Sequence, residues 1–264
     1  MSWFALYQKD LRANQTRLLV NISLLIIFYL SLFFIMFRYN SELALMSIVP
    51  LLMLHIIYMF IGMFDSLSKE WRHHHVNLWL TIPQSGWSLI TAKFSAVATH
   101  FLISLAASFL GFYLLIYVFQ SDIHEIFFMI LSIFHTFWYV PILMLILASL
   151  QLGAFATVLY LISKTVYKGG WLLAIAIGLG THYVWNLFKS TSIYRLITEW
   201  GVLITPADIQ LALDHLLLAQ AEADVSLDME GAFYLGYLVS DMVVIFVLLL
   251  IAGWLIDRFV QLYK

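Results

Sequence analysis

The chain has 264 residues, of which 63% are hydrophobic and only 11% are charged. Soluble domains carry about 45–50% apolar and about 25% charged residues, so this chain lacks the polar side chains that would cover a water-soluble fold. The composition therefore predicts an integral membrane protein. A formal net charge of −2 disfavours a nucleic-acid partner, and the absence of cysteine excludes disulfides and thiolate chemistry.

The first 17 residues precede the long apolar runs and form an amphipathic pattern. Trp3, Tyr7 and Leu11 recur at helical spacing, whereas Lys9 and Arg12 fall on other faces. This pattern is typical of a helix that lies in the membrane surface, so an interfacial helix is expected over residues 1–17. An ordinary N-terminal membrane anchor would explain it equally well.

Runs of about 20 apolar residues identify helices that cross a hydrocarbon core about 30 Å thick. Six such runs are present: Leu18 to Phe37, Leu43 to Phe64, Ala96 to Phe119, Pro141 to Ser163, Gly169 to Phe188 and Ala232 to Ile256. Because continuous apolar runs satisfy their backbone hydrogen bonds as helices, they predict an all-α protein with six transmembrane helices. Residues 1–264 are expected to form a single transmembrane domain.

The segment from Ile126 to Tyr139 extends the fourth run without a polar turn. Pro141 marks a break in it, so we interpret the segment as an interfacial or kinked approach to that span. A seventh span is the alternative.

Positive charges favour one side of this six-span arrangement. That side holds Lys9, Arg12, Arg17, Lys69, Arg72, Lys93, Lys164, Lys168, Arg258 and Lys264, and the other holds Arg38, Lys189 and Arg195. Because Lys and Arg concentrate in cytoplasmic loops, both termini of this multi-pass chain are expected in the cytoplasm.

The predicted external segment, residues 189–231, contains the series Thr205, Pro206, Ala207 and Asp208. A capping threonine, a proline at the first helical position and an acid in the first turn predict a helix start there. We therefore expect short external helices between spans five and six, with an apolar face formed by Ile209, Leu213, Leu216 and Leu217. The acids of this segment either keep an external loop hydrated or favour a cationic cargo.

Motifs for independent catalysis are missing. The chain has no glycine-rich phosphate loop, so it is not expected to hydrolyse ATP, and it has no paired-histidine zinc motif. His73, His74 and His75 are consecutive and would point about 100° apart on a helix, which disfavours a shared metal ion. No catalytic residue, metal ligand or bound cofactor is predicted, and an intramembrane enzyme is the weakest of the functional alternatives.

The loop expected over residues 65–95 carries the most specific pattern. A charged patch with Glu70, Trp71 and Arg72 is followed by apolar residues, a proline turn, and a lysine at the start of span three. The chain resembles the type-2 permease family of ABC transporters, with Glu70, Leu78, Leu80, Pro83, Ser85 and Lys93 at the matching places. The layout of spans and termini extends the resemblance over nearly the whole chain. Any polytopic protein also needs a polar loop here, which is the competing interpretation.

The resemblance implies a permease that dimerises with itself or a sister permease in the bacterial plasma membrane. It would bind two ABC ATPase subunits, which carry ATP and magnesium, through the N-terminal helix and this coupling loop. The coupling residues would be Glu70, Trp71, Arg72, Leu78, Leu80, Pro83 and Lys93. Membrane lipid is the remaining expected partner.

Small residues recur in span five at four-residue spacing: Gly170, Ala174 and Gly178. Such spacing lets two helix backbones approach closely, and in the resembling permeases span five contributes to the dimer contact. A dimer seam and helix packing within one chain both remain open for these residues.

Asp241 is the acid placed deepest within a predicted span, about 4.5 Å from the centre of span six. An intramembrane charge is costly and marks a cargo contact, a proton relay or a structural hydrogen bond. His55, near the middle of span two, is the second intramembrane candidate.

The function favoured at this stage is the permease subunit of an ABC exporter. Few hydrophilic residues lie within the spans, which favours an amphipathic or hydrophobic cargo such as a peptide toxin, an antimicrobial peptide or a lipid-like molecule. The alternative is a proton-coupled secondary transporter in which Asp241 and a histidine titrate.

Overall fold

The computed structural model describes residues 2–39, 43–72, 82–119, 136–165, 168–208, 210–211 and 232–260. Within these residues, six helices are long and apolar enough to cross a membrane: α2 (Gln15–Tyr39), α4 (Ile48–Arg72), α6 (Gly86–Phe119), α8 (Tyr139–Thr165), α9 (Gly170–Lys189) and α12 (Leu235–Leu255), which continues into a π-helical turn at Ile256–Val260. The predicted multi-pass, predominantly α-helical membrane architecture is confirmed for these residues, whereas most of the segment from Ile126 to Tyr139 lies outside them.

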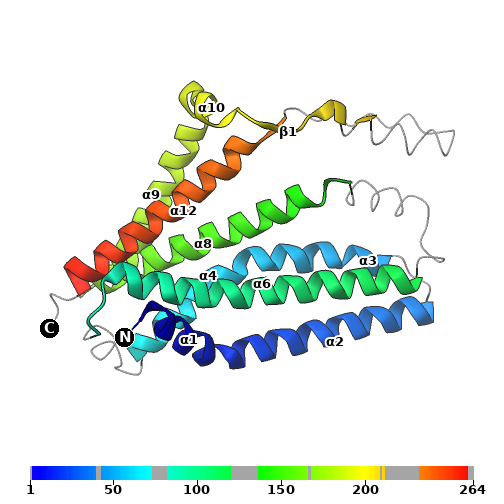
Figure 1. The fold of residues 1–264 in the computed structure, drawn as a ribbon, viewed down its shortest axis with the longest axis horizontal. Helices are drawn as coiled ribbons and strands as arrows, with labels where there is room; N and C mark the ends of the chain where they lie inside the picture. Colours follow the sequence, from blue (N-terminus) through cyan, green and yellow to red (C-terminus); the bar gives the residue numbers. More distant parts are fainter. Residues whose placement is uncertain are drawn as a thin grey trace.

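The shorter elements lie beside or between the spans. They are α1 (Trp3–Ala13), α3 (Leu43–Met46), α10 (Ser192–Thr198), β1 (Val202–Ile204) and β2 (Phe233–Tyr234). The strands β1 and β2 pair antiparallel, a feature that the sequence did not predict. We call the end of the bundle that carries α1 the α1 end, and the end that carries α10 the α10 end (Figure 1).

The helices α6 and α8 organise the bundle. Helix α8 packs against α4, α9 and α12, and α6 packs against α1, α2, α4 and α12. Helix α2 forms one edge of the molecule, whereas α9 and α12 lean away from the other spans toward the α10 end (Figure 1).

The core is apolar and so is most of the surface. Met59, Met63, Ile90, Phe101 and Leu161 are fully buried between α4, α6 and α8. Close packing of α4 on α8 depends on Gly153, where a Cβ atom would lie 2.8 Å from Met59 Cβ. Large apolar side chains also cover the exposed faces of α2 and α9, as the hydrocarbon of a bilayer requires.

Two predicted boundaries shift. Helix α4 continues to Arg72 and α6 already begins at Gly86, so the coupling loop expected over residues 65–95 is helical at both ends. Helices remain stable beyond the hydrocarbon layer where tertiary contacts hold their polar turns. At the N-terminus, the amphipathic helix α1 ends at Ala13 and α2 begins at Gln15, rather than after residue 17.

The predicted helix start at Thr205 is present in the structure. Thr205 Oγ1 accepts from the Asp208 backbone N–H at 3.1 Å, and the Asp208 carboxylate accepts from the Thr205 N–H at 2.7 Å. The Thr205 hydroxyl also donates to the Asp208 carboxylate at 2.7 Å, and this bond, together with the one from the Thr205 N–H, lowers the pKa of Asp208 below its usual range. The apolar face predicted for Ile209, Leu213, Leu216 and Leu217 lies outside the described residues.

Candidate functional site

A buried charge cluster occupies the α1 end. Lys93 is 1% exposed, and Asp10 and Glu70 are 4% and 8% exposed. The Lys93 Nζ atom donates to Asp10 Oδ1 and to Glu70 Oε1, each at 3.0 Å. Because these residues come from α6, α1 and α4, one ammonium group joins three helices. We call Asp10, Glu70 and Lys93 the charge triad.

Lys9 brings a second positive charge close to the two carboxylates of the triad. Lys9 Nζ lies 3.8 Å from Glu70 Oε1 and its side chain is 46% exposed. Two ammonium groups thus face two carboxylates. Removing one member of such a buried set leaves an unpaired charge and lowers the free energy of unfolding by about 3–5 kcal/mol. The three side chains therefore hold α1, α4 and α6 in one arrangement.

Helix α1 is held against α6 by further contacts on both sides of the triad. Trp3 Nε1 donates to Thr91 Oγ1 at 3.0 Å, and the hydroxyls of Tyr7 and Thr99 are 3.0 Å apart. Leu6 is buried in the main apolar core. The amphipathic helix is therefore docked along the first turns of α6, which its sequence pattern did not reveal.

The predicted coupling residues fall into three groups. Glu70 and Lys93 meet in the triad, and Trp71 packs edge-on against Tyr160 of α8 with ring centroids 5.4 Å apart. Arg72 and Pro83 are exposed, on the two sides of the segment that joins α4 to α6. Leu78 and Leu80 lie outside the described residues.

The start of α6 is also joined to the end of α12. The Gly86 N–H donates to Asp257 Oδ1 at 2.7 Å, and a Cβ atom at Gly86 would collide with the Gly253 carbonyl. Two glycines thus let the helices touch backbone to backbone. The start of α6 is therefore joined to α12 as well as to α1.

His55 organises a separate polar cluster between the two ends. Its Nε2 atom lies 3.1 Å from Ser104 Oγ and 3.2 Å from Ser108 Oγ, and Ser104 donates to Asn21 Oδ1 at 2.6 Å. Ser149 of α8 donates to the His55 carbonyl at 2.9 Å. The predicted intramembrane residue His55 thus joins four spans, and its partners were not identified from the sequence.

Asp241 lies within α12, close to where the sequence placed it. It lies four residues from the middle of α12, about 6 Å along the helix, on the side toward the α10 end. The nearby cation is Lys189, and the Tyr194 side chain of α10 lies beside it. Burial raises the pKa of the Tyr194 hydroxyl, and the charge of Asp241 raises it further.

The small residues of span five pack within the chain. Gly170, Ala174 and Gly178 are the three buried residues of α9 among those described. A Cβ atom at Gly170 would meet the Ser163 carbonyl, and Gly178 faces Leu159 of α8. These residues bring α9 onto α8, which is the packing within one chain that the sequence left open, and the dimer seam stays a prediction.

Within the described part of the chain, no three His, Asp or Glu side chains gather as metal ligands, and His73, His74 and His75 lie outside it. Comparison with models of known families, with curated proteins and with solved structures finds no match to this chain. The fold defines a multi-pass α-helical membrane protein, and its function must be argued from the geometry.

Proposed function

We propose that the chain is the membrane-spanning permease subunit of an ABC exporter, as its resemblance to type-2 permeases implies. ATP and magnesium would be bound by two separate ATPase subunits, and the permease would pair with a second copy or a sister permease. The observation that carries the proposal is the charge triad, because it joins α1 to both helices that flank the coupling segment.

The helices that flank the coupling segment are bonded to α1 and to α12, so a force applied at the segment would reach both. The exposed Arg72 and Pro83 frame the segment, and Glu70 and Lys93 anchor its two flanking helices to α1. The bond from Gly86 to Asp257 extends the connection to α12. An ATPase that binds one arrangement of these elements more tightly than another shifts the permease toward that arrangement.

An amphipathic or hydrophobic cargo, such as a peptide toxin, an antimicrobial peptide or a lipid-like molecule, suits the spans best. Their surfaces are apolar over most of α2 and α9, and the polar groups of the His55 cluster bond to one another. A sugar or an inorganic ion would find few free hydrogen-bonding partners there. The chain is expected to work in a bacterial plasma membrane with both termini in the cytoplasm.

The experiment is purification of the full chain together with the ABC ATPase encoded beside it, followed by assays of ATP hydrolysis and cargo export. Pro83→Ala and Arg72→Ala should weaken ATPase binding while leaving the thermal unfolding of the isolated permease unchanged, because both residues are exposed. Asp208→Asn, an exposed site at the α10 end, is the matched control and should have no effect.

A second variant tests coupling rather than binding. Replacing the whole triad (Asp10→Leu, Glu70→Leu, Lys93→Met) removes the charges together and should preserve folding, since well-packed apolar residues can substitute for buried ion pairs. The ATPase should still bind, but export should be lost. Failure to bind any ATPase, together with proton-dependent uptake that Asp241→Asn abolishes, would replace this proposal by a secondary transporter.

A further inference from the structure

Arg17, near the start of α2, has an unusual set of partners. Its Nη1 atom donates to the Gly62 carbonyl at 2.9 Å and lies 3.6 Å from Asp65 Oδ2. Its Nε and Nη2 atoms are buried and have no hydrogen-bond partner among the described residues. These two N–H groups form the edge of a guanidinium that binds two oxygens of one phosphate or carboxylate.

Two further polar side chains lie beside Arg17. The Arg17 Cζ atom lies 5.8 Å from the centroid of the Tyr58 ring, and the Tyr58 hydroxyl interacts with the Arg17 side chain without a hydrogen bond of good geometry. His100 Nδ1 is buried without a hydrogen-bond partner among the described residues, and His100 is only 1% exposed. Since buried polar groups are nearly always paired, the cluster indicates an oxygen-rich ligand.

The local charge favours an anion. Arg17 and Lys69 both face Asp65, at 3.6 Å and 2.8 Å, so two cations share one carboxylate. The Arg17 side chain retains 18% exposure, so part of it lies at the protein surface, although its Nε and Nη2 atoms are covered.

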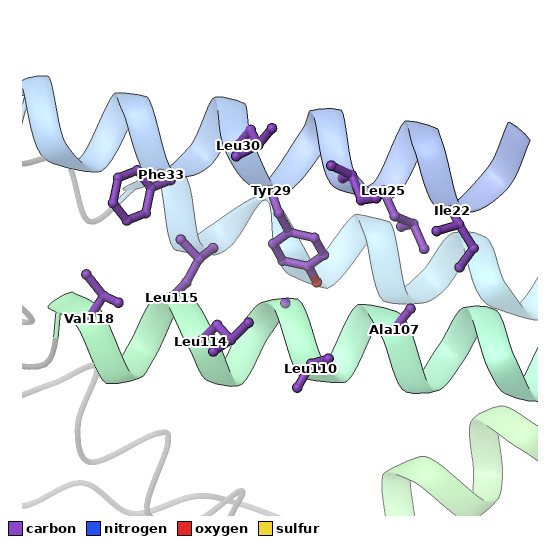
Figure 2. A pocket seen from close by; sticks show the side chains of 12 residues that line it. Ile22, Leu25, Tyr29, Leu30, Phe33, Ala107, Leu110, Leu114, Leu115 and Val118 are labelled. Atoms are coloured by element: carbon purple, nitrogen blue, oxygen red, sulfur yellow. The ribbon is translucent and has the colours of Figure 1, made fainter. Parts of the chain in front are cut away.

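An apolar groove of about 560 Å³ runs between α2 and α6 (Figure 2). On α2 it begins at Ile22, about 7.5 Å along the helix from Arg17, and extends about 16 Å to Phe33. That length matches one leaflet of hydrocarbon, about 15 Å. Tyr29 lines the groove, but its hydroxyl donates to the Ser108 carbonyl at 2.6 Å, so the groove offers an apolar chain no competing polar group.

The walls of the groove suit an acyl chain better than a second helix. Helices in membranes approach one another through small residues. The groove has one glycine, Gly111, and a Cβ atom there would lie 2.6 Å from the Tyr29 ring, so this glycine is already covered. Large side chains such as Leu30, Leu110 and Leu114 form much of the remaining lining (Figure 2).

We propose that Arg17, Tyr58 and His100 bind the phosphate of an anionic phospholipid whose acyl chain lies in the α2–α6 groove. The site is independent of the transport proposal, because it uses neither the charge triad nor the coupling segment. It would hold α2, the most peripheral span, against α4 and α6 through a lipid.

The test uses the full chain purified in a neutral detergent. The midpoint of thermal unfolding is followed by tryptophan fluorescence as phosphatidylglycerol, phosphatidylcholine or inorganic phosphate is added, and bound lipids are counted by native mass spectrometry. Phosphatidylglycerol should raise the midpoint saturably and remain bound as one molecule. Arg17→Gln should weaken that binding about tenfold or more, because it removes a charged bidentate donor.

Three variants separate the components of the site. Lys69→Gln removes a neighbouring charge and should preserve phosphatidylglycerol binding. Ala107→Phe fills the groove and should weaken lipid binding with Arg17 intact. Arg17→Lys, which keeps the charge without the planar edge, replaces Arg17→Gln if the latter does not fold and should bind more weakly than the native chain.

Two results would overturn the proposal. Equal phosphatidylglycerol binding by Arg17→Gln and Lys69→Gln would show that the lipid responds to general charge and not to this site. A shift produced fully by inorganic phosphate, with no added effect of the lipid, would assign the cluster to a free anion.

Discussion

The two ends of the bundle are held together by different chemistry. At the α1 end, buried charges join α1, α4 and α6 through one lysine. At the α10 end, contacts between aromatic rings join α9, α10 and α12. The centroid of the Tyr194 ring lies 6.0 Å from that of Trp185, 5.5 Å from that of Phe188 and 6.2 Å from that of Tyr237. A buried charge is costly unless it keeps its partner, whereas aromatic rings remain in favourable contact when they shift relative to one another. The helices of the α1 end are thus held in a more closely defined arrangement than those of the α10 end.

The largest effect is expected from breaking the charge triad at a single point. Lys93→Met leaves the carboxylates of Asp10 and Glu70 buried together, and should lower the free energy of unfolding by about 3–5 kcal/mol. The measurement is reversible SDS titration in mixed micelles. As a control, Lys69→Met removes a partly exposed partner of Asp65 and should cost under about 1 kcal/mol. Similar losses for the two variants would contradict the importance of the triad.

The close approach of α6 and α12 gives the next largest effect. Gly86→Ala places a methyl group against the Gly253 carbonyl and Ile256 Cβ, and should destabilise the protein by about 1–3 kcal/mol. Gly180→Ala is the matched control, since a Cβ atom there meets nothing within 4 Å. It should stabilise helix α9 by about 0.5–1 kcal/mol. Thermal unfolding midpoints that move in the same direction would refute this packing.

The polar cluster between the ends should contribute less. His55→Leu removes the bonds to Ser104 and Ser108, and interhelical hydrogen bonds in membranes are worth about 0.6 kcal/mol on average. We expect a loss of about 1 kcal/mol in the same SDS titration. Ser31→Ala removes a hydroxyl that donates to the Ile27 carbonyl of its own helix, and this change should be close to neutral. A loss above that of Lys93→Met would make His55, not the triad, the main polar anchor.

The smallest effect is local and depends on pH. The bonds from Thr205 lower the pKa of Asp208, so the ionised carboxylate stabilises this helix start above the ordinary pKa of an aspartate. The stabilisation is lost as the pH falls through the lowered value. The amide proton shift of Thr205, followed by NMR, should report that titration, and Asp208→Asn should abolish it. A midpoint at or above the ordinary value for aspartate would exclude the capping contact.

The two ends also differ in how far they were predictable. The capping pair at Thr205 and Asp208 is local, four residues of chain, so its pattern was sufficient. Glu70 and Lys93 were identified from the loop pattern, but Asp10, the second carboxylate that Lys93 binds, was not, because it lies 83 residues from Lys93. Asp257, which binds the Gly86 N–H from 171 residues away, was equally hidden.

The sequence alone determined the class of protein and its six spans, because hydrocarbon imposes a length and a polarity on every helix that crosses it. Only the tertiary structure decided which helices meet. It turned the small-residue face of α9 onto α8, placed Asp241 near Lys189 and Tyr194, and placed α1 along α6. Spacing within a helix specifies a face, but the partner of that face depends on contacts between distant segments, which a one-dimensional pattern does not contain.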